Sequence, residues 1–168
     1  MPNKFDLKVL KTLSKNQALI ESLFARLAIL CEGDAEYFVA EISLPKALGA
    51  ETLGEKEIVA INCGADTSIN GYSEILTSFG TPFYILCDRK ALSRVDAEYK
   101  GKCTSFPDDD TYCYLEKSNK EEFEEARKSN NSSKEKDNVV LREVLYKIKP
   151  PKEVTELAEK IKPMLTNP

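Results

Sequence analysis

Carboxylates stand at two positions of the chain where buried strands would end. Glu32 follows the apolar run LAILC, and Asp88 follows a second run of this kind. A carboxylate at the end of a buried apolar run is costly unless it has a partner. If a helix begins near Gly33, Glu36 lies one turn after Glu32, and both can face the same space. Hard oxygen ligands suit Mg²⁺ or Mn²⁺, which usually keep several waters and share ligands with substrate phosphates.

The other residue types narrow the chemistry that these carboxylates could do. Acidic residues are common in the first turn of a helix, so Glu36 alone is more typical of a surface helix than of a metal ligand. Glu32 and Asp88, at equivalent strand ends, favour a site. The sequence contains no histidine, which excludes Ser-His-Asp triads and histidine metal sites within it. The chemistry must therefore rest on carboxylates, lysines, tyrosines or thiols.

The composition is that of an ordinary globular protein. The 168 residues are 42% hydrophobic and 31% charged, which suits one domain with a sizeable core. The net charge of −4 argues against a strongly basic nucleic-acid binder, although bound divalent cations would offset acidic residues locally. The sequence shows no apolar run of roughly 20 residues, no secretory signal and no paired spacing among its five cysteines. We therefore expect a cytoplasmic protein without a membrane partner.

Short apolar runs and helical periodicity alternate along the first half of the chain. We predict strands over 27–31, 57–63 and 82–88, with helices over 35–49 and 72–79 between them. Strands that alternate with helices indicate βαβ units, whose right-handed crossovers bring the carboxyl ends of the strands to one edge. Ligands bind at that edge in open parallel sheets. The predicted fold class is α/β, a Rossmann-like parallel sheet flanked by helices.

The two ends of the chain are predicted to be largely helical. After Asp88 we predict short edge strands over 102–106 and 111–117 around the turn PDDD, then helices over 119–129, 138–148 and 151–165. In a leading helical segment (3–24), Phe5, Leu10 and Leu13 would either cover the core or form the interface of a homodimer. The predicted division is a helical lead (1–25), a core (26–130) and a C-terminal helical extension (131–168).

Two segments resemble the Toprim (topoisomerase–primase) domain, in the version found in the OLD (overcoming lysogenisation defect) family nucleases. They are LFARLAILCEGDAEYFV (23–39) and INCGADTSINGYSEILTSFGTPFYILCDRKAL (61–92). The first holds an EGxxE-like motif, the most specific part of a resemblance that covers about residues 21–165. The resemblance implies a Toprim sheet with terminal helices at both ends. It also implies a site that uses Mg²⁺ or Mn²⁺ to hydrolyse DNA phosphodiester bonds.

The resemblance also implies roles for individual residues. Glu32, Glu36 and Asp88 match the metal-binding carboxylates of the family, and Glu121 matches a later acidic ligand. Catalysis is expected from Glu32 and Asp88 together with a late lysine, which is either Lys134 or Lys136. The residues expected to contact substrate or phosphate are Gly33, Gly64, Asp66 and Lys90.

The chain departs from the family pattern in two ways. Lys90 occupies the second position of the Asp-x-Asp motif, where a cation would repel a metal but could contact a phosphate. The GxxxxGK[ST] motif of the family's ATPase domain does not occur in this sequence. We therefore expect a stand-alone or split Toprim endonuclease or nickase. The alternative is a catalytically weakened binding or regulatory module that acts with a separate ATPase subunit. Primase-like polynucleotide synthesis ranks third because the EGxxE motif and terminal helices resemble the nucleases more closely.

The cysteines and the acidic turn allow competing interpretations. Cys31, Cys63 and Cys87 each end a predicted strand, and we favour small buried hydrophobes over a soft-metal or redox site. Cys103 and Cys113 are expected in edge strands that face each other. The PDDD turn lacks the ligand spacing of a calcium loop and is expected to be a solvated turn.

Overall fold

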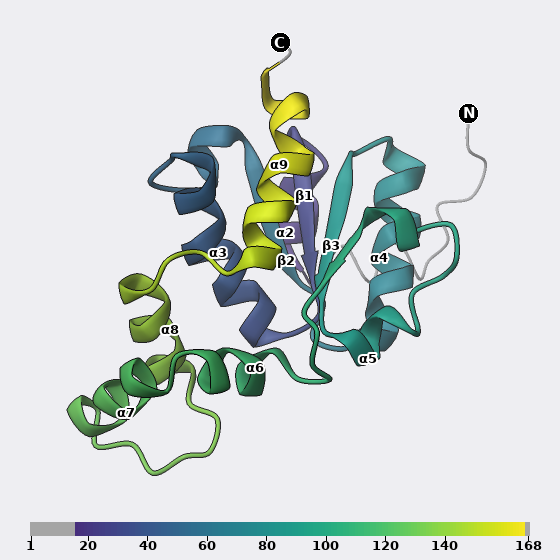
Figure 1. Ribbon diagram of the computed structural model, residues 1–168. Helices are drawn as coiled ribbons and strands as arrows, with labels where there is room; N and C mark the ends of the chain where they lie inside the picture. Colours follow the sequence, from purple (N-terminus) through teal and green to yellow (C-terminus); the bar gives the residue numbers. More distant parts are fainter. Residues whose placement is uncertain (1–15, 167–168) are drawn as a thin grey trace.

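The structure, a computed structural model, describes residues 16–166. At its centre is a parallel sheet of four strands (Figure 1). The strands are β1 (Leu27–Cys31), β2 (Ile58–Asn62), β3 (Phe83–Cys87) and β4 (Cys103–Ser105). They lie in the order β2-β1-β3-β4, and all neighbours are parallel. The predicted α/β class and the parallel sheet are therefore confirmed.

The central strand β1 is buried along its whole length. A parallel sheet with helices on both faces needs strands that are apolar on both sides, which explains the continuous apolar run LAILC. Leu27, Ile29 and Cys31 belong to the core cluster on one face, whereas Ala28 and Leu30 belong to that on the other. This double burial fixes the end of β1, and with it the position of the residue that follows.

Helices cover both faces of the sheet. One face carries α3 (Asp34–Leu48) and α9 (Lys152–Thr166), and α8 (Asn138–Lys147) packs against α3. The other face carries α2 (Gln17–Ser22) and α4 (Asp66–Phe79). The remaining short elements are η1 (Gly54–Lys56), α5 (Arg89–Leu92), η2 (Lys100–Lys102), α6 (Thr111–Ser118) and α7 (Lys120–Ser129). Figure 1 shows the green helices α6 and α7 grouped with α8 beside the N-terminal part of α3. Among residues 16–166, no helix is both long and apolar enough to cross a membrane.

The segment 111–117 was predicted as an edge strand, and this prediction is wrong because it forms helix α6. The Asp110 carboxylate caps the helix by accepting a hydrogen bond from the Cys113 backbone N–H at 2.9 Å. Tyr112 and Leu115, three residues apart, are both buried, which fits helical rather than alternating periodicity. Cys113 is therefore helical and does not lie in a strand opposite Cys103.

Other boundaries differ in smaller ways. The three long strands end within one residue of their predicted bounds, and β4 forms the sheet edge inside the predicted segment 102–106. Helix α4 begins at Asp66, six residues before the predicted start at Tyr72, and buries Ile69 in its first turns. The polar, Gly-containing sequence there resembles a loop, but the burial of Ile69 stabilises the helix. Phe5, Leu10 and Leu13 lie outside the described residues.

Candidate active site

The site lies at the switch point of the sheet, which is the place where chain connections on the two sides of β1 run in opposite directions. The chain passes from β1 through α3 to β2 on one side of β1, and from β2 through α4 to β3 on the other. The carboxyl ends of β1 and β3 therefore flank the crevice in which α/β sheets bind ligands. Glu32 follows β1 and Asp88 follows β3. The Asp88 backbone N–H donates a hydrogen bond to Oε2 of Glu32 at 3.2 Å, so the two residues lie side by side.

Helix α3 brings Glu36 to the same place. Gly33 is its N-cap residue, and the Gly33 backbone N–H donates to Oε2 of Glu36 at 3.2 Å. This contact folds the Glu36 side chain back toward the end of β1, where it is only 5% exposed. Glu36 is thus a buried carboxylate of the site and not a surface helix residue.

Burial and crowding make the ionised state of these glutamates costly. Burial raises the pKa of Glu32 to about 7; the hydrogen bond from Asp88 opposes the rise, and the neighbouring carboxylates add to it. Burial also raises the pKa of Glu36, and the neighbouring Asp88 carboxylate adds to the rise. Among residues 16–166, no lysine or arginine forms an ion pair with Glu32, Glu36 or Asp88. No ion pair within the described residues therefore offsets the cost of ionising these carboxylates.

These carboxylates line one wall of a cleft of about 580 Å³. The opposite wall is formed by the start of α6, the end of the 130–137 loop and the start of α8. Two predicted site lysines, Lys134 and Lys136, belong to this wall, so the structure brings both to the carboxylate site. Lys136 forms an ion pair with Asp110, whereas no carboxylate within the described chain pairs with Lys134.

Several predicted site residues lie away from the cleft. Glu121 is exposed on α7, and Lys90 is exposed on α5; neither lines the cleft. Asp66 forms an ion pair with Arg94 outside the cleft lining. Gly64 has a left-handed backbone, with φ of 77°, which accounts for a glycine at that turn.

The structure also places three carboxylates in the cleft lining that were not predicted as site residues, Asp34, Asp110 and Asp137. Asp110, predicted to lie in a solvated turn, follows the parallel strand β4 and lines the cleft beside Lys136. Asp34 accepts hydrogen bonds from Asn62 at 2.7 Å and from Asn138 at 2.9 Å. These bonds tie the last residue of β2 and the first residue of α8 to the start of α3. The signal for Asp110 was its place after a fourth strand, which becomes visible only when 111–118 is recognised as a helix.

The donor set suits a hard divalent cation. Within residues 16–166, no three Asp, Glu or Cys side chains are already arranged to hold a metal ion. Glu32, Glu36 and Asp88 each use one carboxylate oxygen to accept a backbone N–H, from Asp88, Gly33 and Ala91 respectively. Their second oxygens are not used in these bonds. Mg²⁺ needs only one or two carboxylates besides water and phosphate, so these residues fit such an ion.

The buried cysteines beneath the site are not poised as ligands. Cys31, Cys63 and Cys87 are buried and free of disulfides. Burial raises the pKa of Cys31 and of Cys63 well above the usual value, so both thiols stay protonated at neutral pH. Contact with the thiol of Cys103 raises the pKa of Cys87 in the same direction. These thiols serve as small apolar side chains under the carboxylates.

A parallel sheet flanked by helices, with an acidic cleft at its switch point, is typical of an α/β ligand-binding domain. Residues 23–89 match the family model described as "Overcoming lysogenization defect protein-like, TOPRIM domain". The resemblance to the OLD-type Toprim domain inferred from the sequence is thus confirmed for this segment. No curated protein shows a significant match to the sequence.

Solved structures of OLD proteins share the fold. The C-terminal region of the Xanthomonas campestris pv. campestris OLD protein aligns with a TM-score of 0.65 and 16% identity over 84% of this chain and 97% of that one. The C-terminal region of the Burkholderia pseudomallei OLD protein aligns with a TM-score of 0.65 and 15% identity, over 85% and 100% of the two chains. At this identity, the likeness establishes the architecture from the sheet through the terminal helices.

Proposed function

We propose that this protein is a Mg²⁺- or Mn²⁺-dependent DNA endonuclease or nickase that hydrolyses phosphodiester bonds. One observation carries the proposal. Glu32, Glu36 and Asp88 converge at the switch point without a cationic partner among the described residues, and Lys134 and Lys136 lie across the cleft. The OLD-like Toprim match supports the choice of DNA as the substrate.

The residues of the cleft divide between two tasks. Glu32, Glu36 and Asp88 would hold the cation, with Asp110 at the edge of the same cleft. When bound, the cation would supply Lewis-acid stabilisation of the charge that develops on the phosphate. Lys134 and Lys136 would donate hydrogen bonds to phosphate oxygens and orient the scissile group toward the carboxylate wall. The buried strands β1 and β3 keep the two carboxylate-bearing ends at a fixed separation.

Nicking of supercoiled plasmid in Mg²⁺ or Mn²⁺ tests this proposal. We expect the Glu32→Gln and Asp88→Asn variants to lose at least about a hundredfold in rate, because they remove charge that holds the cation. Glu124→Gln, an exposed change on α7, is the matched control and should keep the wild-type rate. Cleavage that both site substitutions leave unchanged would defeat the assignment.

A binding or regulatory role is the second candidate, and two observations favour it. Lys90 stands where the family pattern has a second aspartate, and the described carboxylates are not pre-arranged around a cation. In this role the domain would act with a separate ATPase subunit. Calorimetry that detects no Mn²⁺ binding, together with stable association with a separately encoded ATPase, would support this candidate over the nuclease.

A further inference from the structure

The lysines of the cleft are carried by a segment that has little packing of its own. Residues 130–137 connect α7 to α8 without helix or strand and have the polar sequence NNSSKEKD. Lys134 and Lys136 are both exposed residues of this loop, yet both reach the cleft. A polar loop without apolar anchors samples many conformations unless specific hydrogen bonds hold it. Hydrogen bonds at both ends hold the 130–137 loop in place.

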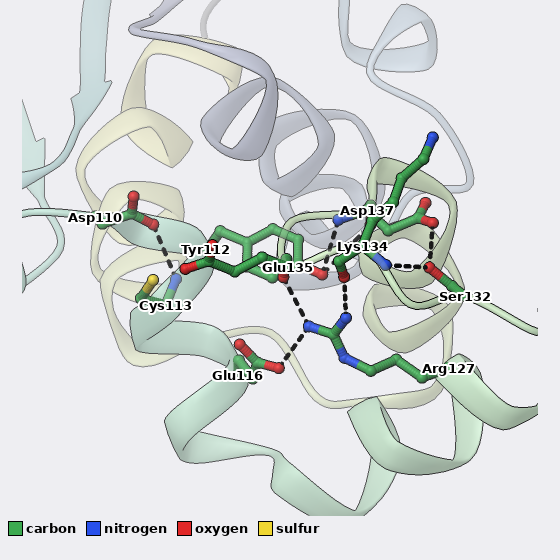
Figure 2. Close-up of polar contacts among 9 residues, drawn as sticks. All are labelled: Asp110, Tyr112, Cys113, Glu116, Arg127, Ser132, Lys134, Glu135 and Asp137. Carbon is green, nitrogen blue, oxygen red and sulfur yellow. Dashed lines mark hydrogen bonds and ion pairs between the residues drawn. The ribbon is translucent and has the colours of Figure 1, made fainter.

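Arg127, near the end of α7, makes the main contacts (Figure 2). Its Nη2 donates to the Glu135 carbonyl oxygen at 2.8 Å and to Oε1 of Glu116 at 2.7 Å. Its Nη1 donates to the carbonyl oxygen of Lys134. One guanidinium thus joins α6, α7 and two consecutive peptide groups of the loop, one of which belongs to Lys134. The Arg127 side chain is only 22% exposed, so these contacts are largely shielded from solvent.

The other end of the loop is fixed independently. The Asp137 backbone N–H donates to the Tyr112 hydroxyl at 3.1 Å. The Ser132 hydroxyl donates to Oδ2 of Asp137 at 2.6 Å, and Oδ1 of Asp137 accepts from the Val139 N–H at 2.8 Å to cap α8. Figure 2 shows the loop passing between these contacts and the guanidinium of Arg127. The carbonyl groups of 134 and 135 therefore bond to Arg127, whereas the Lys134 N–H donates to the Ser132 hydroxyl at 3.4 Å and the Asp137 N–H donates to Tyr112. The Lys136 ammonium is held separately by its ion pair with Asp110.

We infer that Arg127 is a positioning residue that sets the lysine loop against the carboxylate wall. It holds the peptide carbonyls around Lys134 so that the side chains of Lys134 and Lys136 extend over the cleft. Arginine suits this task because its planar guanidinium presents several donors in a fixed geometry, which a lysine ammonium cannot reproduce. The inference rests on the proposed function, since it gives the loop lysines their role at the phosphate.

Limited proteolysis measures the loop directly and does not depend on activity. Trypsin cleaves after Lys134 and Lys136, and mass spectrometry identifies the cut. We expect the Arg127→Ala variant to be cut there at least about tenfold faster than the wild type, since charged hydrogen bonds are lost. Arg127→Lys keeps a positive charge near Glu116 and should still be cut faster. Arg26→Ala is the matched control, because Arg26 contacts Glu57 and the Leu165 carbonyl at the amino end of β1.

Nicking rates then test whether the loop matters for catalysis. We expect Arg127→Lys and Arg127→Ala to lower the nicking rate by about tenfold or more, and Arg26→Ala to leave it unchanged. In a Lys134→Ala, Lys136→Ala background, adding Arg127→Ala should have no further effect, because there is no lysine left to position.

Each outcome decides a different point. Wild-type loop cleavage in both Arg127 variants would overturn the inference, and so would a rate loss that is equal with and without the loop lysines. A wild-type protein that does not nick DNA overturns the proposed function and, with it, the catalytic role given to the loop. The Arg127 inference alone fails if the wild type nicks DNA and the Arg127 variants match it.

Discussion

Replacing Glu32 with glutamine removes a charge that the fold holds at a cost. The pKa of Glu32 rises from an ordinary value of 4.5 to about 7, mainly through burial. A difference of this size corresponds to about 3 kcal/mol at most. We expect about 1–2 kcal/mol, because solvent screens a carboxylate that is only partly buried. Glutamine keeps an oxygen to accept the Asp88 N–H and lacks the charge, so without metal the Glu32→Gln variant should be more stable than the wild type.

The sign of the pH dependence follows from the raised pKa. Between pH 4.5 and 7 the folded protein holds more protons at Glu32 than the unfolded chain does. The free energy of unfolding contributed by this group therefore falls as the pH rises through that range. Near pH 4 the variant and the wild type should be about equally stable. Near pH 8 the variant should be more stable by about 1–2 kcal/mol.

Urea denaturation in the presence of EDTA, at several pH values, measures this difference. Glu124→Gln, an exposed change outside the cleft lining, serves as the control. Saturating Mn²⁺ should reverse the order, because an ion that binds only the folded wild type adds to its stability. A Glu32→Gln variant that is less stable than the wild type at pH 8 without metal would refute the reasoning, as would a difference that does not change with pH.

Three further predictions concern the surroundings of the site. Asp110→Ala should lower the free energy of unfolding by about 1–2 kcal/mol in urea titrations, because it removes the α6 cap and the Lys136 ion pair; Asp110→Asn keeps the cap and should lose less than half of that. Gly64→Ala should cost about 1 kcal/mol by the same measurement, because φ there is 77° although no atom would crowd the new Cβ; an unchanged stability would contradict the left-handed turn. Alkylation at pH 7, followed by mass spectrometry, should label Cys103 before Cys31, because the neighbouring Cys87 thiol and nearby lysines lower the pKa of Cys103 while burial raises that of Cys31; equal labelling would contradict these environments.

The sheet and its acidic edge were predictable because they depend on local patterns. LAILC and its two counterparts are apolar on both faces, as parallel strands with helices on each side must be. Once the three strands are parallel, Glu32 and Asp88 must lie at the same edge of the sheet. They meet because β1 and β3 are neighbours in the structure. The position of Glu36 followed from the spacing of one helical turn.

The second wall of the cleft was not predictable in the same way. Tyr112, Cys113 and Tyr114 favour a strand by propensity, and only the cap from Asp110 and the buried pair Tyr112 and Leu115 make the segment helical. The Arg127 guanidinium donates hydrogen bonds to the backbone carbonyls of Lys134 and Glu135. Contacts to backbone carbonyls leave no signature in a sequence. Glu121 satisfied the family pattern by residue type, yet its helix turns it toward solvent.

The most direct test is anomalous scattering from crystals of the protein soaked in Mn²⁺. We expect a manganese peak among the carboxylates of Glu32, Glu36 and Asp88, in the cleft opposite Lys134, and its loss in crystals of the Asp88→Asn variant. Crystals with ordered cleft side chains and no peak at these three carboxylates, at a Mn²⁺ concentration that supports nicking in solution, would contradict this expectation.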